Sequence, residues 1–170
     1  MGLPRSWKCR SCGKEHDTPS LCFGTDAPDQ WHLLSTKELA TSQLDKSWCF
    51  IDAKDEQAFF VRGHIDIPII GADEVFTWSV WVSLSEKSFS RKMEIWNSVD
   101  RETEPPYFGW LCTSIEVFPD TMYLKTSVQE RPGDTVPLVT VEPTAHPLAV
   151  AQHGGIAIET VTRWLEQLLH

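Results

Sequence analysis

Two cysteines near the start of the chain have the spacing of a metal-binding turn. Cys9 and Cys12 are separated by two residues and followed by Gly13, which permits a tight turn. Two thiolates at this spacing can hold one tetrahedral zinc ion, each sulfur about 2.3 Å from the metal. His16 and Cys22 complete a Cys-x2-Cys-x3-His-x5-Cys pattern that is similar to a zinc knuckle. We therefore expect Cys9, Cys12, His16 and Cys22 to bind zinc.

Other interpretations of these residues stay open. Cys49, in a strand-like segment, is a rival fourth ligand that would tie the knuckle to a sheet. The Cys9–Cys12 pair could instead be two reduced thiols in a loop, or a redox pair. A redox role is disfavoured because the motif lacks the strand and helix that lower such a thiol's pKa. Three or four protein ligands with no general base nearby indicate a structural zinc site rather than a catalytic one.

The histidines form no catalytic pattern. The chain has 6 His and 24 acidic residues, and His64, His146 and His153 lie in loop-like or strand-end segments. Their spacing matches no hydrolase or metalloenzyme motif, and the sequence contains no nucleophile elbow, P-loop or dinucleotide fingerprint. We expect no catalytic residue, and keep His146 and His153 as candidates for binding.

Aromatic residues cluster in the segment 104–110, where Tyr107, Phe108 and Trp110 follow a Pro pair. If these rings are exposed, they form a rigid recognition surface, because Tyr and Trp supply contact area at low entropy cost. If they are buried, they cover the core. Trp81 raises the same question, because it lies on the polar face of an alternating segment that either a second layer or a partner must cover.

The distribution of charge narrows the class of partner. The chain has 170 residues and a net charge of −9, although its first sixteen residues carry a net charge of +3. The remainder therefore carries −12 and repels nucleic acid, because nucleic-acid binding requires clustered Lys and Arg. If the acidity serves more than solubility, it favours a basic protein partner.

The sequence shows neither a membrane span of about 20 apolar residues nor the apolar core of a signal peptide. We expect a cytoplasmic protein with no membrane partner. In that compartment its five cysteines would stay reduced and form no disulfide framework.

Hydrophobic periodicity predicts the elements that must position these residues. Segments rich in β-branched and aromatic residues indicate strands at 47–52, 58–70, 75–84, 121–128 and 136–141. Helical spacing indicates helices within 31–44, 86–99 and 156–170, and residues 102–111 and 142–155 are predicted to be loops.

Capping patterns set the expected helix starts. The first helix is predicted to begin after Ser35 or Thr36, and the second after a capping box of Ser83 and Glu86. The order of elements predicts one α+β domain over 1–170, with an antiparallel sheet and helices packed on one side. A zinc-knuckle-like segment over 1–30 precedes the body at 31–170.

Six blocks of sequence carry a resemblance to a known family. They are CRSCGKEH, FFVRGHIDIPI, FTWSVWVSLSEKSF, EPPYFGWL, FPDTMYLKTSV and EPTAHPLAV. In this order they resemble the bacterial domain of unknown function 2199, along nearly the whole chain. The resemblance implies a bacterial, single-domain protein and carries no established activity.

The same resemblance bears on the ligands. It implies that Cys9, Cys12 and His16 are family features, whereas Cys22 is particular to this sequence. It also implies that a Cys often replaces His64, an exchange that zinc tolerates, so that Cys49 with His64 is a second possible ligand pair. Hairpin geometry argues against that pair, because the two residues would be offset by about four positions, roughly 13 Å along their strands.

Two hypotheses for the function follow. The first is a non-enzymatic, acidic protein-binding module with a structural zinc site, of the immunity or antitoxin type, whose negative charge steers a basic partner. The second is an enzyme or small-ligand-binding protein with a cleft near residues 104–110 and 143–155.

Overall fold

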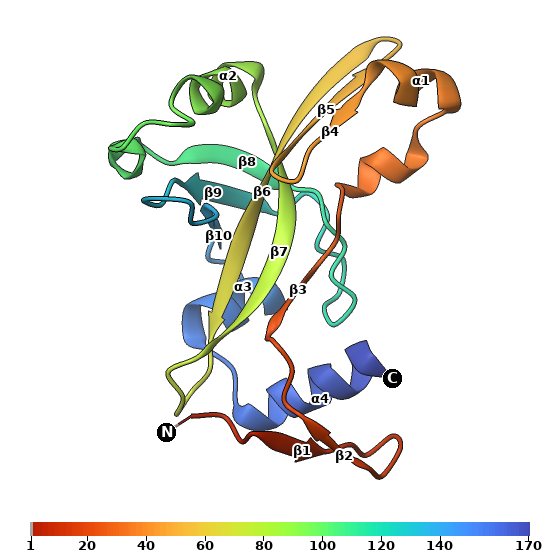
Figure 1. The fold of residues 1–170 in the computed structure, drawn as a ribbon, viewed down its shortest axis with the longest axis vertical. Coiled ribbons are helices and arrows are strands. Elements are labelled where there is room, and N and C mark those ends of the chain that lie inside the picture. Colours follow the sequence, from red (N-terminus) through yellow and green to blue (C-terminus); the bar gives the residue numbers. More distant parts are fainter. Residues whose placement is uncertain (1) are drawn as a thin grey trace.

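A computed structural model describes residues 2–170 and shows a mixed α+β fold built around two long strands (Figure 1). The strands are β1 (Ser6–Lys8), β2 (Glu15–Asp17), β3 (Cys22–Gly24), β4 (Gln43–Leu44), β5 (Trp48–Ala53), β6 (Glu56–Pro68), β7 (Val75–Leu84), β8 (Tyr107–Leu111), β9 (Lys125–Gln129) and β10 (Leu138–Val141). The α-helices are α1 (Thr36–Thr41), α2 (Glu86–Glu94), α3 (Pro147–Gly154) and α4 (Ile158–Leu169), and the 3-10 helices are η1 (Asp29–Leu33) and η2 (Arg101–Thr103).

The main sheet closes into a five-stranded barrel. Its strands pair in the order β6–β7–β8–β9–β10, and β10 returns to β6. The expected open antiparallel sheet with helices on one side is therefore corrected to a closed barrel, and two pairings, β3 with β7 and β10 with β6, are parallel. The α+β class is confirmed.

The length of β6 explains the closure. Its first half pairs with β5, from Trp48↔Val61 to Ala53↔Glu56, and further along the chain it pairs with β10 through Leu138↔His64. Pairing with β7 occupies the opposite edge, along the run from Phe59↔Leu84 to Pro68↔Val75. A strand of 13 residues can thus serve a hairpin at one end and a barrel at the other.

Two apolar clusters make the core. The larger one fills the barrel and the contact with α3 and α4, and includes Ile65, Phe76, Val80 and Leu148. The smaller one lies around Trp81, with Cys49, Ile51, Phe60 and Cys112. This second layer explains why β7 is buried on both faces.

The helices differ in how well periodicity predicted them. A capping box of Ser35 and Glu38 confirms the start predicted for α1. The cap of α2 is Ser85 rather than Ser83, because Ser83 still belongs to β7. None of the helices in residues 2–170 combines the length and apolar character that a membrane span requires.

Candidate metal centre

Cys9, Cys12 and His16 are brought together by the short hairpin of β1 and β2. The strands pair through Trp7↔His16 and Lys8↔Glu15, and the backbone amide of Gly13 donates to the carbonyl of Cys9 at 2.8 Å. Gly13 has a φ of +72°, the left-handed conformation that glycine adopts without steric cost. The Cys-x-x-Cys-Gly sequence therefore forms the turn that places both sulfurs on one side.

The fourth residue of the cluster is His170, which follows α4. One ligand atom from each of Cys9, Cys12, His16 and His170 lies within 4.8 Å of every other. Cys12 Sγ is 3.1 Å from His16 Nε2, and the rings of His16 and His170 have centroids 5.0 Å apart. In a tetrahedral zinc site the ligand atoms are about 3.3–3.8 Å apart, so a small adjustment would close these four around one ion.

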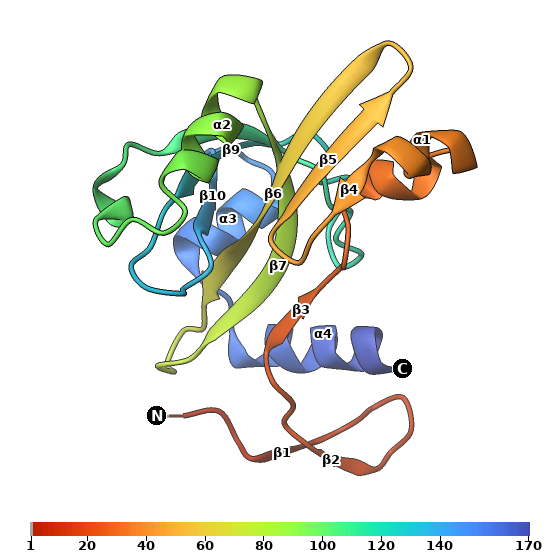
Figure 2. The same ribbon diagram turned by 45° about the horizontal axis from the view of Figure 1, so that its top comes forward.

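Packing against α4 holds the hairpin in place. Trp7 and Cys9 are buried in the main core cluster. Trp7 contacts α4 around a gap of only about 10 Å³ that Val161 and Leu165 also line. The backbone amide of Arg10 donates to Glu166 Oε1 at 2.8 Å. Figures 1 and 2 both show the tip of the hairpin beside the last turn of α4.

The environment of Cys9 favours its thiolate form. Burial alone would raise the pKa of the Cys9 thiol, but hydrogen bonds from the backbone and side chains of Cys12 and Ser11 outweigh it and lower the pKa. A thiolate is the form that binds metal. Two thiolates and two imidazoles are a donor set that zinc accepts, and with a divalent ion they would form a neutral complex.

The alternative ligands lie elsewhere. Cys22 is exposed on β3 and Cys49 is buried on β5, and neither belongs to the cluster. Burial raises the pKa of Cys49 to about 12, and burial with the nearby Asp66 carboxylate raises that of Cys22. His64 is four positions beyond Phe60, the partner of Cys49 in the β5–β6 pair, as the hairpin argument expected.

The predicted binding residues are divided between the interior and the surface. Trp81 and Tyr107 are buried and cannot form an exposed contact surface, because the second cluster covers Trp81 and the alternation of β8 turns Tyr107 inward. Phe108 and Trp110 point outward, with exposed fractions of 54% and 41%. Their rings pack edge to face at 5.1 Å.

The two remaining histidines are engaged by backbone groups. His146 accepts a hydrogen bond from the amide of Leu148 as the cap of α3, and its Nε2 lies 2.8 Å from the carbonyl of Asp120. His153 Nε2 lies 2.7 Å from the carbonyl of Val141. A hollow of about 260 Å³ between Phe108 and Pro143 occupies part of the expected cleft, and neither histidine lines it.

His170 is a candidate ligand that the sequence did not predict. The helical stripe of residues 156–170 predicted its helix, but no spacing relates the end of that helix to Cys9. Only the docking of the hairpin on α4 brings the residue into the cluster.

Comparison with known proteins identifies the family. No curated protein and no solved structure matches the chain at a significant level. A family model matches residues 8–156, a stretch that contains Cys9, Cys12 and His16 and stops before His170. The chain belongs to the family described as "Uncharacterized protein conserved in bacteria (DUF2199)".

Proposed function

We propose that Cys9, Cys12, His16 and His170 bind one zinc ion with a structural role. The observation that carries the proposal is the convergence of these four ligand atoms within 4.8 Å. Four protein ligands fill a tetrahedral site, whereas a catalytic zinc keeps one position for water or substrate. The ion would fasten the β1–β2 hairpin to α4.

Metal analysis of single-residue variants tests this proposal. The wild-type protein, purified without added zinc, is expected to hold about one zinc per chain. Cys9→Ser should abolish binding, and His170→Ala should weaken it at least about tenfold. Cys22→Ser is the matched control, since it removes an exposed thiol outside the cluster. Less than one zinc in about ten wild-type chains, or an unaffected His170→Ala variant, would reject the site.

We further propose that the zinc-fastened protein binds another protein. Support comes from Phe108 and Trp110, two exposed aromatic residues that lie on one face of β8 beside a hollow of about 260 Å³. Exposed aromatic anchors next to a pocket are typical of binding hot spots. The net charge of −9 favours a basic partner, which includes the toxins that immunity proteins neutralise.

Affinity purification from the native host identifies the partner, and variants then test the surface. Phe108→Ala with Trp110→Ala should weaken binding of the purified partner at least about tenfold. Val99→Ala is the control, because Val99 is exposed and lies outside β8. If the partner binds both variants equally, this face is not the interface. Association with a basic partner should slow as salt rises.

A further inference from the structure

A second cavity lies on the barrel, away from the cysteines. It has a volume of about 250 Å³ and opens between α2, β6 and the β9–β10 loop. Its walls include the cations Arg62, Lys92 and Arg101, and the apolar groups Trp96, Val136 and Pro137. Three of the 15 basic side chains of an acidic protein therefore meet at one hollow.

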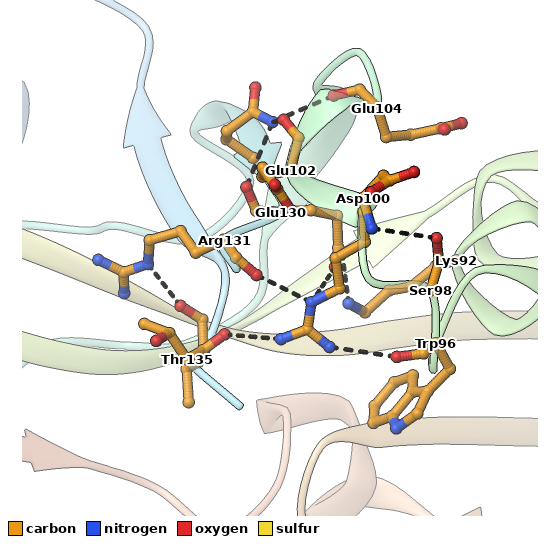
Figure 3. Close-up of polar contacts among 12 residues, drawn as sticks. Lys92, Trp96, Ser98, Asp100, Glu102, Glu104, Glu130, Arg131 and Thr135 are labelled. Atoms are coloured by element: carbon orange, nitrogen blue, oxygen red, sulfur yellow. Dashed lines mark hydrogen bonds and ion pairs between the residues drawn. The ribbon is translucent and has the colours of Figure 1, made fainter. Parts of the chain in front are cut away.

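Lys92 is the most buried of these cations. It is 3% exposed, and its Nζ donates to Glu130 Oε1 at 2.5 Å and lies 5.0 Å from the centre of the Trp96 ring. Figure 3 shows Lys92 and Glu130 meeting near the backbone of Trp96 and Arg131. An ammonium group carries three N–H donors, and within residues 2–170 Glu130 is the hydrogen-bond acceptor of Lys92. Its other two N–H donors have no hydrogen-bond acceptor in that part of the chain.

Arg101 is held by backbone carbonyls. Its guanidinium donates to the carbonyl oxygens of Arg131, Trp96 and Thr135 at 2.8–3.2 Å. Carbonyl groups fix the guanidinium without cancelling its charge. The nearest carboxylate is again Glu130, 3.7 Å away, which Arg101 shares with Lys92.

Arg62, which lines the cavity from β6, is also held by backbone carbonyls. It donates to the carbonyls of Lys46 and Thr25, and its buried Nε has no acceptor within residues 2–170. Its ion-pair partner, Asp26, is fully exposed and 3.8 Å away, so water screens that interaction. Three cations and Asp134 thus line the cavity. Lys92 and Arg101 share one carboxylate, the partner of Arg62 is exposed to water, and Arg62 Nε has no acceptor within residues 2–170.

We propose that this cavity binds a small organic anion with a carboxylate or phosphate head group and a compact apolar body. The head group would accept hydrogen bonds from Arg62 and Lys92, and the body would lie against Trp96, Val136 and Pro137. A volume of about 250 Å³ lies just below the usual range of ligand pockets, roughly 300–1,000 Å³, and excludes a dinucleotide. The proposal does not depend on zinc, because the cavity and the metal centre share no residue.

Calorimetric titration with three probes tests the ligand class. Benzoate and phenyl phosphate carry the two head groups on the same ring, and benzyl alcohol is the neutral control. At least one of the two anions should bind at a single saturable site, and the stronger of them identifies the head group. Benzyl alcohol should not bind measurably. If neither anion saturates the protein at about 10 mM, where even a weak site would be filled, the proposal is wrong.

Variants locate the binding. Lys92→Met with Glu130→Leu replaces both members of the buried pair and keeps the net charge. Arg101 loses its shared carboxylate, but its nitrogens already donate to backbone carbonyls, so loss of the Lys92 donors should weaken anion binding at least about tenfold. Lys87→Gln is the control, because it removes an exposed cation from the same helix. Arg62→Gln, a change in β6 rather than α2, provides an independent test and should also weaken binding about tenfold. Unchanged anion affinity in the folded double variant, or in folded Arg62→Gln, would overturn the proposed site.

Discussion

Lys92 and Glu130 form an ion pair in which both side chains are at most 4% exposed. Transfer of two charges out of water is costly, and a close partner repays that cost only in part. Burial therefore lowers the pKa of Lys92 even though the Glu130 carboxylate acts in the opposite direction. Lys92, a cation that lines the second cavity, is thus also a residue whose substitution is expected to affect stability.

Replacing one partner of this pair should destabilise the protein more than replacing both. Lys92→Met alone is expected to destabilise the protein by about 3–5 kcal/mol, because it leaves Glu130 buried with Arg101 as its remaining counter-charge. Lys92→Met with Glu130→Leu should lose less stability than Lys92→Met alone, because the charge that it leaves unpaired is that of Arg101, which three backbone carbonyls hold. Urea unfolding measures both values. Equal losses of stability in the two variants would contradict the burial of this ion pair.

His64 should make stability depend on pH near neutrality. Burial lowers the pKa of His64, Asp66 acts to raise it, and Arg131 and Arg62 act to lower it. The unfolded chain, in which the pKa of His is about 6.5, therefore binds a proton more readily than the folded one. The contribution of this group is present above about pH 6.5 and is lost as the pH falls below it.

The measurement is the midpoint of urea unfolding between pH 5 and 8 in the wild type and in His64→Gln. Between pH 6.5 and 5 the urea midpoint of the wild type should fall, and that of His64→Gln should fall less. Parallel curves for the two proteins would show that His64 does not titrate differently on folding.

The residues of the metal centre show what local spacing can and cannot predict. Cys9, Cys12 and His16 are recognisable because one turn positions all three. His170 is not, because its place depends on how α4 docks, which no short-range pattern encodes. Cys22 fits a ligand spacing in the sequence, but it leads into β3, whose pairing with β7 removes it from the hairpin.

Among the elements, the strands with strong alternation were predicted closely. Strand β7 covers the predicted 75–84, and β5 with β6 forms the predicted hairpin. Strand β8 was predicted as a loop because a Pro pair precedes it. The prediction overlooked the alternation of buried and exposed residues within the strand. Helix α3 was predicted as a loop as well. Its Pro147 lies in the first turn, where a helix tolerates proline.

The closure of the barrel could not be predicted from periodicity, because it depends on a close approach of β6 and β10. A Cβ atom at Gly63 would collide with Val139 Cγ2 and lie 3.2 Å from the carbonyl oxygen of Pro137. The next residue, His64, donates its amide to that carbonyl at 2.8 Å. Gly63 thus permits the contact that turns the sheet into a barrel.

Gly63→Ala should therefore destabilise the barrel by about 1–3 kcal/mol, since an added methyl group in a packed site forces neighbours apart. Val139→Ala should recover part of that loss in the double variant by removing the group that collides. The test is a double-mutant cycle from urea unfolding. Purely additive effects would contradict a direct contact between the two positions.

On the scale of the molecule, the proposed ion joins segments from opposite ends of the sequence. Chelation should loosen the β1–β2 hairpin, whose remaining attachments are the packing of Trp7 and Cys9 and the hydrogen bond from Arg10 to Glu166. Trypsin should then cut after Lys8, Arg10 or Lys14 at least about tenfold faster, while the barrel stays protected. Mass spectrometry of timed digests locates the cuts, and restored zinc should reverse the effect. Cleavage that is unaffected by chelation would show that zinc does not hold the hairpin.

The contact between Arg10 and Glu166 spans 156 positions of the chain. We expect a contact of such length to form late, after the barrel has brought both segments near each other, because closing a longer loop costs more entropy. An ion bound there would be absent from the rate-limiting step of folding and would be lost only once the native state opens. Zinc would therefore leave the refolding rate nearly unchanged and would lower the unfolding rate.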